Sequence, residues 1–267
     1  MTQSTLPSAL SALPELAEDW FGKRVVIFID YDGTLTPIVS RPDQAMLSEA
    51  MRLALQRLAR QTTVTILSGR DRASAEKMVG LAELYYAGSH GFDISGPGGF
   101  EHRNEQGEAL RPELEQAAAE LEEAIQPLSG AWVDRKRYAV AVHNRQVRDA
   151  WLPNLEKAVA EVAKRHPKLR LTGGKRIQEL RPDIDWDKGK ALRWLLKTLK
   201  LDGDDVVPMF IGDDLTDEDA FSEIEEDGIG IRVGHDAAES RARYMLRDTD
   251  EVRRFLERLH SVLGRPM

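Results

Sequence analysis

The fold is decided by residues 25–34, which read VVIFIDYDGT. The stretch opens with apolar, mostly β-branched residues, a pattern typical of a strand buried on both faces of a parallel sheet. It stops at Asp30, and a second carboxylate, Asp32, follows beside Gly33, which permits an unusual backbone turn. Ligands of open α/β sheets bind beyond the carboxyl ends of the strands, so acidic residues with a chemical role are expected here. Taken alone, the two aspartates could equally end a strand and open a turn.

Two carboxylates this close repel each other unless a cation or a proton lies between them. Mg²⁺ takes oxygen ligands, usually one or two carboxylates together with water and substrate phosphate. The stretch therefore suggests a Mg²⁺-assisted reaction at a phosphate, in which one aspartate is free to attack phosphorus or to move a proton.

The composition narrows the class of protein. A chain of 267 residues can form one large domain or a core with a smaller inserted domain. The net charge of -8, with no basic stripe, argues against nucleic acid as a partner. The absence of cysteine excludes disulfides, thiol catalysis and thiolate zinc sites, and it fits a reducing cytoplasm. Because no apolar run reaches the ~20 residues of a membrane helix and residues 1–20 lack a signal-peptide pattern, we expect a cytoplasmic protein with no membrane partner. We also expect it to be a monomer.

Further strands alternate with helices along much of the chain. Apolar runs at 62–67, 84–87 and 206–211 are predicted strands, and amphipathic helical stripes lie between them. This alternation predicts an α/β fold with a Rossmann-like, parallel, right-handed core.

The region from about residue 96 to 173 differs from the rest. A helical stripe followed by two short strands occurs there twice, which indicates an α+β unit with an antiparallel sheet rather than more of the parallel core. We interpret it as an inserted cap domain, bounded by turns rich in glycine and proline. The expected division is a core over residues 1–97, a cap over 98–182 and the rest of the core over 183–267.

Polar groups also follow other predicted strands or open predicted helices. Ser68 could be only a helix N-cap, and Lys188 only a surface lysine. However, Asp187 is a good N-cap, which would place Lys188 in a first helical turn, where a cation is unfavourable. A bound anion would remove that conflict. A second acidic pair, Asp213 and Asp214, facing the first would need a cation, so the set specifies a dianionic phosphate and a divalent metal.

These groups resemble the four motifs of the haloacid dehalogenase superfamily of phosphohydrolases, in order and in type. The motifs are Asp30-x-Asp32-Gly-Thr, Ser68, Lys188 and Gly212-Asp213-Asp214. With the cap, the resemblance covers nearly the whole chain after about residue 22. It implies that Asp30 is the nucleophile, which forms an aspartyl-phosphate, and that Asp32 protonates the leaving alkoxide and then deprotonates water. Ser68 and Lys188 would bind the phosphoryl oxygens.

The resemblance also implies Mg²⁺ as the cofactor. Its implied ligands are the carboxylate of Asp30, the backbone carbonyl of Asp32 and the carboxylate of Asp213, with Asp214 and Asp217 as nearby support. Lys190 competes with Lys188 for the lysine role, and the Asp-Lys-Gly pattern of the superfamily favours Lys188.

The cap narrows the resemblance to the trehalose-6-phosphate phosphatases. Lys136 lies seven residues before His143, as in that family. Further matching motifs are LSGR at 67–70, GSHG at 88–91, ELRP at 179–182, WDKG at 186–189 and GDDLTDE at 212–218. The resemblance implies a sugar phosphate as substrate, hydrolysed to trehalose and phosphate. The implied substrate-binding residues are Ser68, Gly69, Arg70, His90, Lys136, His143, Arg145 and Glu179.

Two positions depart from the family pattern, which usually has glutamate at Asp134 and tyrosine at Asn144. A shorter carboxylate and a lost ring affect sugar contacts rather than the core chemistry. The alternatives are therefore the same hydrolysis of another sugar phosphate, such as sucrose, glucosylglycerol or mannosylglycerate phosphate, or a phosphomutase. A regulator that only binds sugar phosphate is disfavoured by the intact aspartates, and a zinc hydrolase by the lack of a paired histidine motif.

Overall fold

The computed structural model describes residues 6–39, 41–174, 176–234 and 240–264. The chain divides into two compact units, each of which is described here by itself. Unit 1 comprises Met1–His102 and Trp186–Met267, and unit 2 comprises Arg103–Asp185. The domain boundaries expected from the sequence, after residues 97 and 182, stay a prediction.

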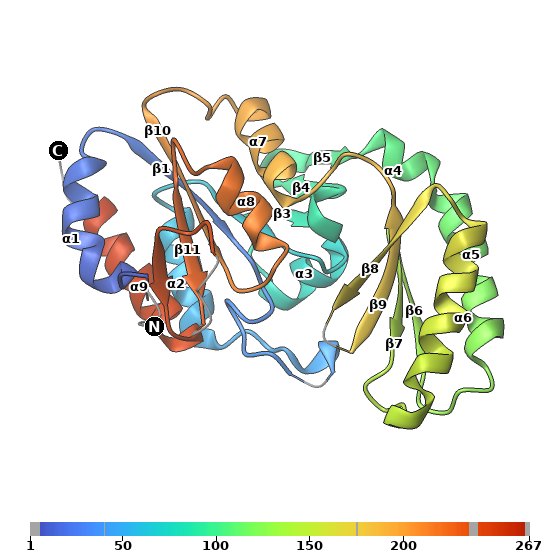
Figure 1. Ribbon diagram of the computed structural model, residues 1–267. Coiled ribbons are helices and arrows are strands. Elements are labelled where there is room, and N and C mark those ends of the chain that lie inside the picture. The colour runs from blue at the N-terminus through green and yellow to red at the C-terminus, as the bar shows by residue number, and fades with distance from the viewer. Residues whose placement is uncertain (1–5, 40, 175, 235–239, 265–267) are drawn as a thin grey trace. The chain divides into compact units, whose positions relative to one another are not determined.

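Unit 1 is built on an eight-stranded, mostly parallel sheet (Figure 1). The strand β1 lies near its centre and pairs in parallel with β10 on one side and β2 on the other, whereas β3 and β4 pair antiparallel. In sheet order the strands are β12 (Tyr244–Leu246), β11 (Ile229–Val233), β10 (Val206–Gly212), β1 (Arg24–Ile29), β2 (Val64–Leu67), β3 (Tyr85–Gly88), β4 (Asp93–Gly96) and β5 (Phe100–Arg103). The predicted α/β class with a parallel core is confirmed.

Helices cover both faces of this sheet, because alternate residues of β1 enter two different hydrophobic cores. Val25, Ile27 and Ile29 pack in a core with α1 (Ala9–Asp19), α2 (Glu49–Ala59), α3 (Arg72–Val79) and α9 (Thr249–Leu263). Val26 and Phe28 pack in a second core with α7 (Lys188–Thr198) and α8 (Asp217–Glu223). The apolar run of β1 is therefore buried on both faces, as its composition predicts. Short 3₁₀ helices are η1 (Pro42–Gln44), η2 (Ser89–Gly91) and η3 (Pro97–Gly99).

Unit 2 is an antiparallel sheet covered on one face by two helices (Figure 1). In sheet order its strands are β6 (Trp132–Lys136), β7 (Ala139–His143), β9 (Ile177–Pro182) and β8 (Leu169–Gly174). The two covering helices are α5 (Arg111–Ile125) and α6 (Leu152–Arg165); the short helix α4 (Glu105–Ala109) precedes α5, and η4 (Asp149–Trp151) precedes α6. Val140, Val142 and Leu180 point toward α5 and α6 and form the core with them. The predicted pair of helix-strand-strand repeats is thus confirmed.

None of the helices within the described ranges combines the length and the apolar character needed to cross a membrane.

Candidate active site

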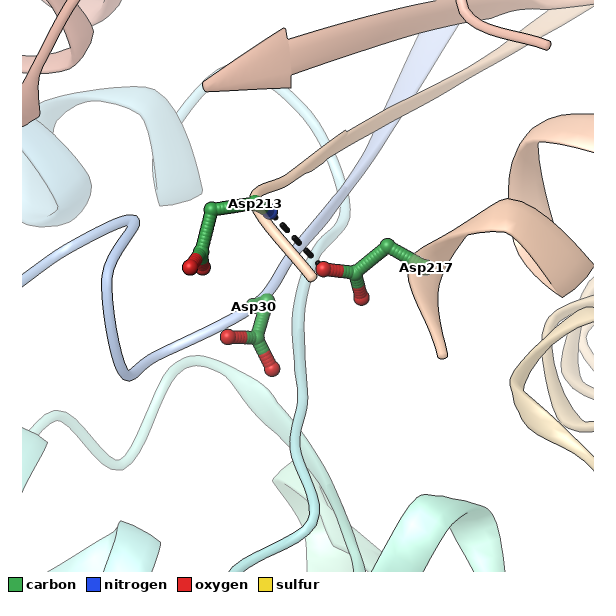
Figure 2. Close-up of side chains that lie close together, drawn as sticks. All are labelled: Asp30, Asp213 and Asp217. Atoms are coloured by element: carbon green, nitrogen blue, oxygen red, sulfur yellow. Dashed lines mark hydrogen bonds between the residues drawn. The ribbon is translucent and has the colours of Figure 1, made fainter. Parts of the chain in front are cut away.

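Three aspartates converge at the carboxyl ends of the central strands of unit 1. Asp30 follows β1, Asp213 follows β10, and Asp217 opens α8. One carboxylate oxygen of each lies within 4.8 Å of one from the others (Figure 2). The parallel pairing of Ile29 with Ile211 brings the ends of β1 and β10 side by side, so residues nearly 180 positions apart in the sequence meet. This is the edge of the sheet at which open α/β folds bind ligands.

Lys188 supplies the positive charge of this cluster. Its Nζ donates to Oδ1 of Asp30 at 2.8 Å and to Oδ1 of Asp217 at 2.6 Å, and its side chain is only 1% exposed. Asp187 caps α7 by accepting from the backbone N–H of Lys190, which places Lys188 at the first helical position. The Lys190 side chain pairs instead with Asp187 and is 40% exposed. The structure therefore brings Lys188, and not Lys190, to the aspartates.

The carboxyl groups resist ionisation. Burial raises the pKa of Asp30 well above its usual range, although Lys188 opposes the shift. Burial also raises the pKa of Asp213 to about 7, with the Asp217 charge adding to the effect. The pKa of Asp217 rises to about 6 because the group is buried, although Lys188 again opposes the shift. One lysine does not compensate three carboxylates, so the cluster favours further positive charge.

The donor set fits a hard divalent cation. All the groups of the cluster offer carboxylate oxygens, which Mg²⁺ prefers over nitrogen or sulfur ligands. Oδ1 of Asp213 accepts from the Thr34 hydroxyl at 2.9 Å, which fixes the direction of the carboxylate. Gly33 has a φ of +88°, and a Cβ at this position would overlap the Asp213 carboxylate. Gly33 of the first motif thus leaves space for the carboxylate of Asp213, which belongs to the motif at residues 212–214.

The Asp217 carboxylate also organises the loop after β10. Its Oδ2 accepts from the backbone N–H groups of Asp213, at 2.8 Å, and of Asp214, at 2.9 Å. Asp214 itself accepts from the backbone N–H and the hydroxyl of Thr216. Although burial raises it, the pKa of Asp214 is lowered overall, because Lys188 and Thr216 favour the carboxylate form. Of the expected metal ligands, Asp30 and Asp213 thus lie in the cluster, and Asp217 is its third carboxylate.

Asp32 and Asp214 contribute no carboxylate to that cluster of described residues. Asp217 was expected only as nearby support. The sequence signal for a larger role of Asp217 is its position, four residues after Asp213 and at the start of a helix.

The Asp32 carboxylate forms a two-bond ion pair. Arg70 donates to both of its oxygens, from Nε and from Nη2, each at 2.6 Å. The guanidinium of Arg70 also lies over the Tyr31 ring, 5.1 Å from its centroid. Arg70, in the loop after β2, therefore holds Asp32, the expected general acid and base, close to the end of β1.

The loops after β2 and β3 place the remaining expected groups of unit 1. Ser68 is buried, and its Oγ accepts from the backbone N–H of Arg70 at 3.2 Å. The backbone N–H of His90 donates to the carbonyl of Ser68 at 2.9 Å. A Cβ at Gly69 would come within 2.9 Å of the His90 ring, so these two positions lie against each other. Ser68, Gly69, Arg70 and His90 are thus brought together at neighbouring strand ends.

The expected sugar-binding residues of unit 2 lie on and beside its sheet. Lys136 Nζ donates to Oε1 of the buried Glu179 at 2.7 Å. Although burial raises it, the pKa of Glu179 is lowered overall by Lys136 and Arg181. His143 ends β7, and its Nε2 lies 3.7 Å from Oδ2 of Asp134. Arg145 follows β7 and is exposed.

A family model described as trehalose-phosphatase matches residues 28–250, which include the aspartate cluster, Lys188 and the whole of unit 2. This chain belongs to the trehalose-phosphatase family. It is accordingly a phosphatase, a hydrolase, as the sequence predicts.

Curated members of the trehalose-phosphatase family match most of the chain. A probable trehalose-phosphate phosphatase of Arabidopsis thaliana is 44% identical over 264 residues, covering 95% of this chain and 75% of the relative. A trehalose 6-phosphate phosphatase of Zea mays is 42% identical over 273 residues, covering 97% and 76%. The trehalose-phosphate phosphatase of Mycobacterium tuberculosis is 43% identical over 255 residues, covering 95% and 65%.

Solved structures show the same fold. The C-terminal domain of a trehalose-6-phosphate phosphatase of C. albicans superposes with a TM-score of 0.81 at 24% identity, covering 97% of this chain and 99% of that one. A haloacid dehalogenase-like hydrolase from Bacteroides thetaiotaomicron superposes with a TM-score of 0.64 at 18% identity, covering 89% and 100%. This trehalose-phosphatase family member therefore has a haloacid dehalogenase-like fold.

Proposed function

We propose that this phosphatase hydrolyses trehalose 6-phosphate to trehalose and phosphate, through an aspartyl-phosphate on Asp30. The observation that carries the proposal is the buried ion pair of Asp30 with Lys188 inside the aspartate cluster. A binding protein needs no such nucleophile, held beside a cation at the phosphate-binding edge of the sheet. The substrate is supported by two relatives named as trehalose-phosphate phosphatases, which are more than 40% identical over at least 95% of this chain.

In the first step, an oxygen of Asp30 attacks phosphorus and the bond from phosphorus to the sugar oxygen breaks. Asp32 gives its proton to the departing sugar alkoxide. In the second step, Asp32 takes a proton from water, whose oxygen attacks phosphorus and releases phosphate from Asp30. Arg70 holds both oxygens of Asp32, so it would have to release one of them for each proton transfer.

The phosphoryl charge needs cationic and hydrogen-bonding partners. Lys188 lies against Asp30 and would stabilise the phosphoryl oxygens as charge builds up in the transition state. Ser68 would donate its hydroxyl to another of these oxygens. Mg²⁺ would be held by the carboxylates of Asp30 and Asp213 and by the Asp32 carbonyl, and when bound it neutralises phosphate charge. Asp214 and Asp217 would support this ligand set.

The sugar would be recognised by unit 2 and by the loops around Arg70 and His90. Lys136, Glu179 and His143 offer a cation, a carboxylate and an imidazole on one sheet. Sugar hydroxyls both donate and accept, so paired donors and acceptors of this kind give specificity. Arg145 and Gly69 complete the proposed substrate-binding set.

The decisive experiment measures phosphate release, with and without Mg²⁺, from trehalose 6-phosphate beside sucrose, glucose and mannosylglycerate phosphates. We expect release that depends on Mg²⁺ and is fastest for trehalose 6-phosphate. A preference for another sugar phosphate would show that trehalose 6-phosphate is not the substrate, and we would then ascribe the changed specificity to Asp134 and Asn144. An isomerised sugar phosphate without free phosphate would instead identify a phosphomutase.

A further inference from the structure

The sheet of unit 2 has one face that its helices do not cover. On β7, Val140 and Val142 point into the core with α5 and α6. Because side chains alternate along a strand, Ala139, Ala141 and His143 point to the other face. Residues that pair with these three share that face.

The register of the paired strands identifies the other residues on this open face. Trp132 pairs with His143, and Asp134 pairs with Ala141, which also pairs with Glu179 on β9. Lys136 is two residues beyond Asp134 on the same strand, and Arg181 is two residues beyond Glu179. We call this surface the sugar face. Its polar or aromatic members on β6, β7 and β9 are Trp132, Asp134, Lys136, His143, Glu179 and Arg181, and β8 adds Thr172 and Arg170, which pair with Glu179 and Arg181.

Charged side chains lie at one end of the sugar face. Glu179 is buried and accepts from Lys136 at 2.7 Å and from Arg181. Arg170 pairs with Arg181 and lies on the same face, so three cations and one carboxylate leave a net charge of about +2 at this end. An anionic ligand group is therefore favoured here.

The other end of the sugar face is aromatic. The rings of Trp132 and His143 stack with centroids 4.0 Å apart and planes 5° from parallel. Trp132 nevertheless remains 47% exposed, so part of its indole is open to a ligand. Asp134 is the charged neighbour, with its Oδ2 3.7 Å from Nε2 of His143. Interaction with His143 lowers the pKa of Asp134, so this end carries a negative charge at neutral pH.

The two ends are separated by a distance that suits two sugar rings. Trp132 and Lys136 are four residues apart on one strand, which corresponds to about 13 Å between their Cα atoms. On the neighbouring strand, the small residue Ala141 lies between the positions opposite Trp132 and Lys136, and Ala139 lies opposite Lys136. A single hexose does not span this distance, whereas a disaccharide does.

We propose that Trp132 is a specificity-determining residue whose exposed indole stacks on the hexose ring that carries no phosphate. The proposal rests on the proposed function, because it takes a phosphorylated disaccharide as the substrate. A pyranose presents apolar C–H groups on the faces of the ring and hydroxyls at its rim, so a flat indole beside an imidazole and a carboxylate suits it.

Charge decides which ring lies at which end. A phosphate dianion is attracted by the positive end with Lys136 and Arg181, and repelled by Asp134 at the aromatic end. The neutral ring is therefore assigned to Trp132. Because His143 already holds the indole in place, little side-chain freedom is lost when the sugar binds.

The test compares four variants on two substrates, trehalose 6-phosphate and glucose 6-phosphate, which lacks the second ring. Trp132→Ala and Trp132→Leu remove the flat ring, whereas Trp132→Phe keeps one. Trp151→Ala is the matched control, because Trp151 is an exposed tryptophan of the same unit at 52% exposure and lies outside the sugar face.

We expect Trp132→Ala and Trp132→Leu to lower kcat/KM for trehalose 6-phosphate by about 5- to 20-fold, mostly through KM. Glucose 6-phosphate turnover should stay within about twofold, because that substrate never reaches the indole. Trp132→Phe should recover most of the loss, and Trp151→Ala should match the wild-type enzyme. Free trehalose should inhibit the Ala and Leu variants less strongly, by a similar factor, a change that a merely structural role would not produce.

The outcomes separate this inference from the proposed function. If the wild-type enzyme prefers trehalose 6-phosphate over glucose 6-phosphate and the Ala and Leu variants keep the whole preference, the role of Trp132 is wrong and the proposed function stands. A Leu variant equal to wild type would overturn the stacking role even if the Ala variant failed to fold. A wild-type enzyme without any preference would overturn both.

Discussion

At the scale of single residues, the pairing of Asp30 with Lys188 would serve both substrate binding and chemistry in the proposed mechanism. The lysine is almost fully buried and donates to one oxygen of Asp30, and in the proposed mechanism the second oxygen would attack phosphorus. Burial alone would keep Asp30 protonated and therefore non-nucleophilic. Lys188 opposes this shift, and in the proposed mechanism bound Mg²⁺ would favour the charged form further.

The division of labour between the first two aspartates can be tested by trapping. Asp30→Asn should abolish turnover and leave no labelled protein when the enzyme is quenched in acid with substrate carrying labelled phosphate. Asp32→Asn should slow turnover by about 10²- to 10⁴-fold, because general acid–base catalysis is lost, but should still accumulate label. Label on Asp30→Asn, or normal turnover by it, would show that another group attacks phosphorus.

The crowded carboxyl groups should make the metal-free protein less stable as the pH rises. In the unfolded chain aspartate titrates near 3.9, whereas in the folded protein Asp213 titrates at about 7 and Asp217 at about 6. Between about pH 4 and 7 the folded state thus binds more protons than the unfolded state. These groups therefore lower the free energy of unfolding as the pH increases across that window.

Thermal unfolding with a chelator checks this expectation. Tm of the wild-type protein should fall more steeply from about pH 5 to 8 than Tm of Asp213→Asn, which lacks one of the raised groups. Mg²⁺ should raise the wild-type Tm more at the upper end of this range, because the ligands are then ionised. Equal pH slopes for the two proteins would contradict the assignment.

At the scale of elements, the strongly patterned segments could be predicted from the sequence, and the weakly patterned ones could not. The strands β1, β2 and β10 and the helix α7 follow from apolar runs and an N-cap, and these elements position Asp30, Ser68, Asp213 and Lys188. The strands β4, β5 and β12 are three or four residues long, and the glycines between β4 and β5 read as a linker. Their pairing is decided by neighbours in the sheet, which a single sequence does not reveal.

The same limit applies within the site. The ion pair of Asp32 with Arg70, and the stack of Trp132 on His143, depend on which strands pair and in which register. No local pattern contains that information. By contrast, the motif residues could be predicted because their spacing follows strand ends and helix starts.

Asp187, the N-cap residue of helix α7, should contribute both to the stability of the protein and to its catalytic rate. Replacing Asp187 with alanine removes the acceptor for the Lys190 N–H and should cost about 0.5–2 kcal/mol of stability. It should also lower kcat, since Lys188 sits at the first position of this helix. Ser48→Ala removes the equivalent cap of α2 and should reduce stability without changing kcat.

Denaturant unfolding together with steady-state kinetics measures both effects. Asp187→Asn should retain most of the wild-type stability and turnover, because asparagine is also a good N-cap. A normal kcat in Asp187→Ala would show that the cap does not position Lys188.

At the scale of the whole molecule, the described residues form separate hydrophobic cores. Two lie on the faces of the eight-stranded sheet of unit 1, and one lies between the sheet and helices of unit 2. The aspartate cluster belongs entirely to unit 1. Units with their own cores can unfold in separate transitions.

Calorimetry should detect this independence. Leu155→Ala empties a fully buried position in unit 2 and should destabilise that unit by about 2–5 kcal/mol, whereas Leu55→Ala should do the same for unit 1. Mg²⁺ should stabilise only the transition that Leu55→Ala shifts, because a ligand stabilises the unit that binds it. A single transition, moved equally by both variants and by Mg²⁺, would contradict two independent units.

The hydrogen bond between Thr34 and Asp213 joins residues 179 positions apart, with all of unit 2 in between. During synthesis at ~5–20 residues per second, this interval lasts on the order of ten to forty seconds. A growing chain therefore has the complete sequence of unit 2 before it has β10, and Asp30 cannot meet Asp213 and Asp217 until that strand leaves the ribosome. By the proposed mechanism, the enzyme is inert through most of its own translation, and truncated products that end before residue 213 should not carry out the reaction.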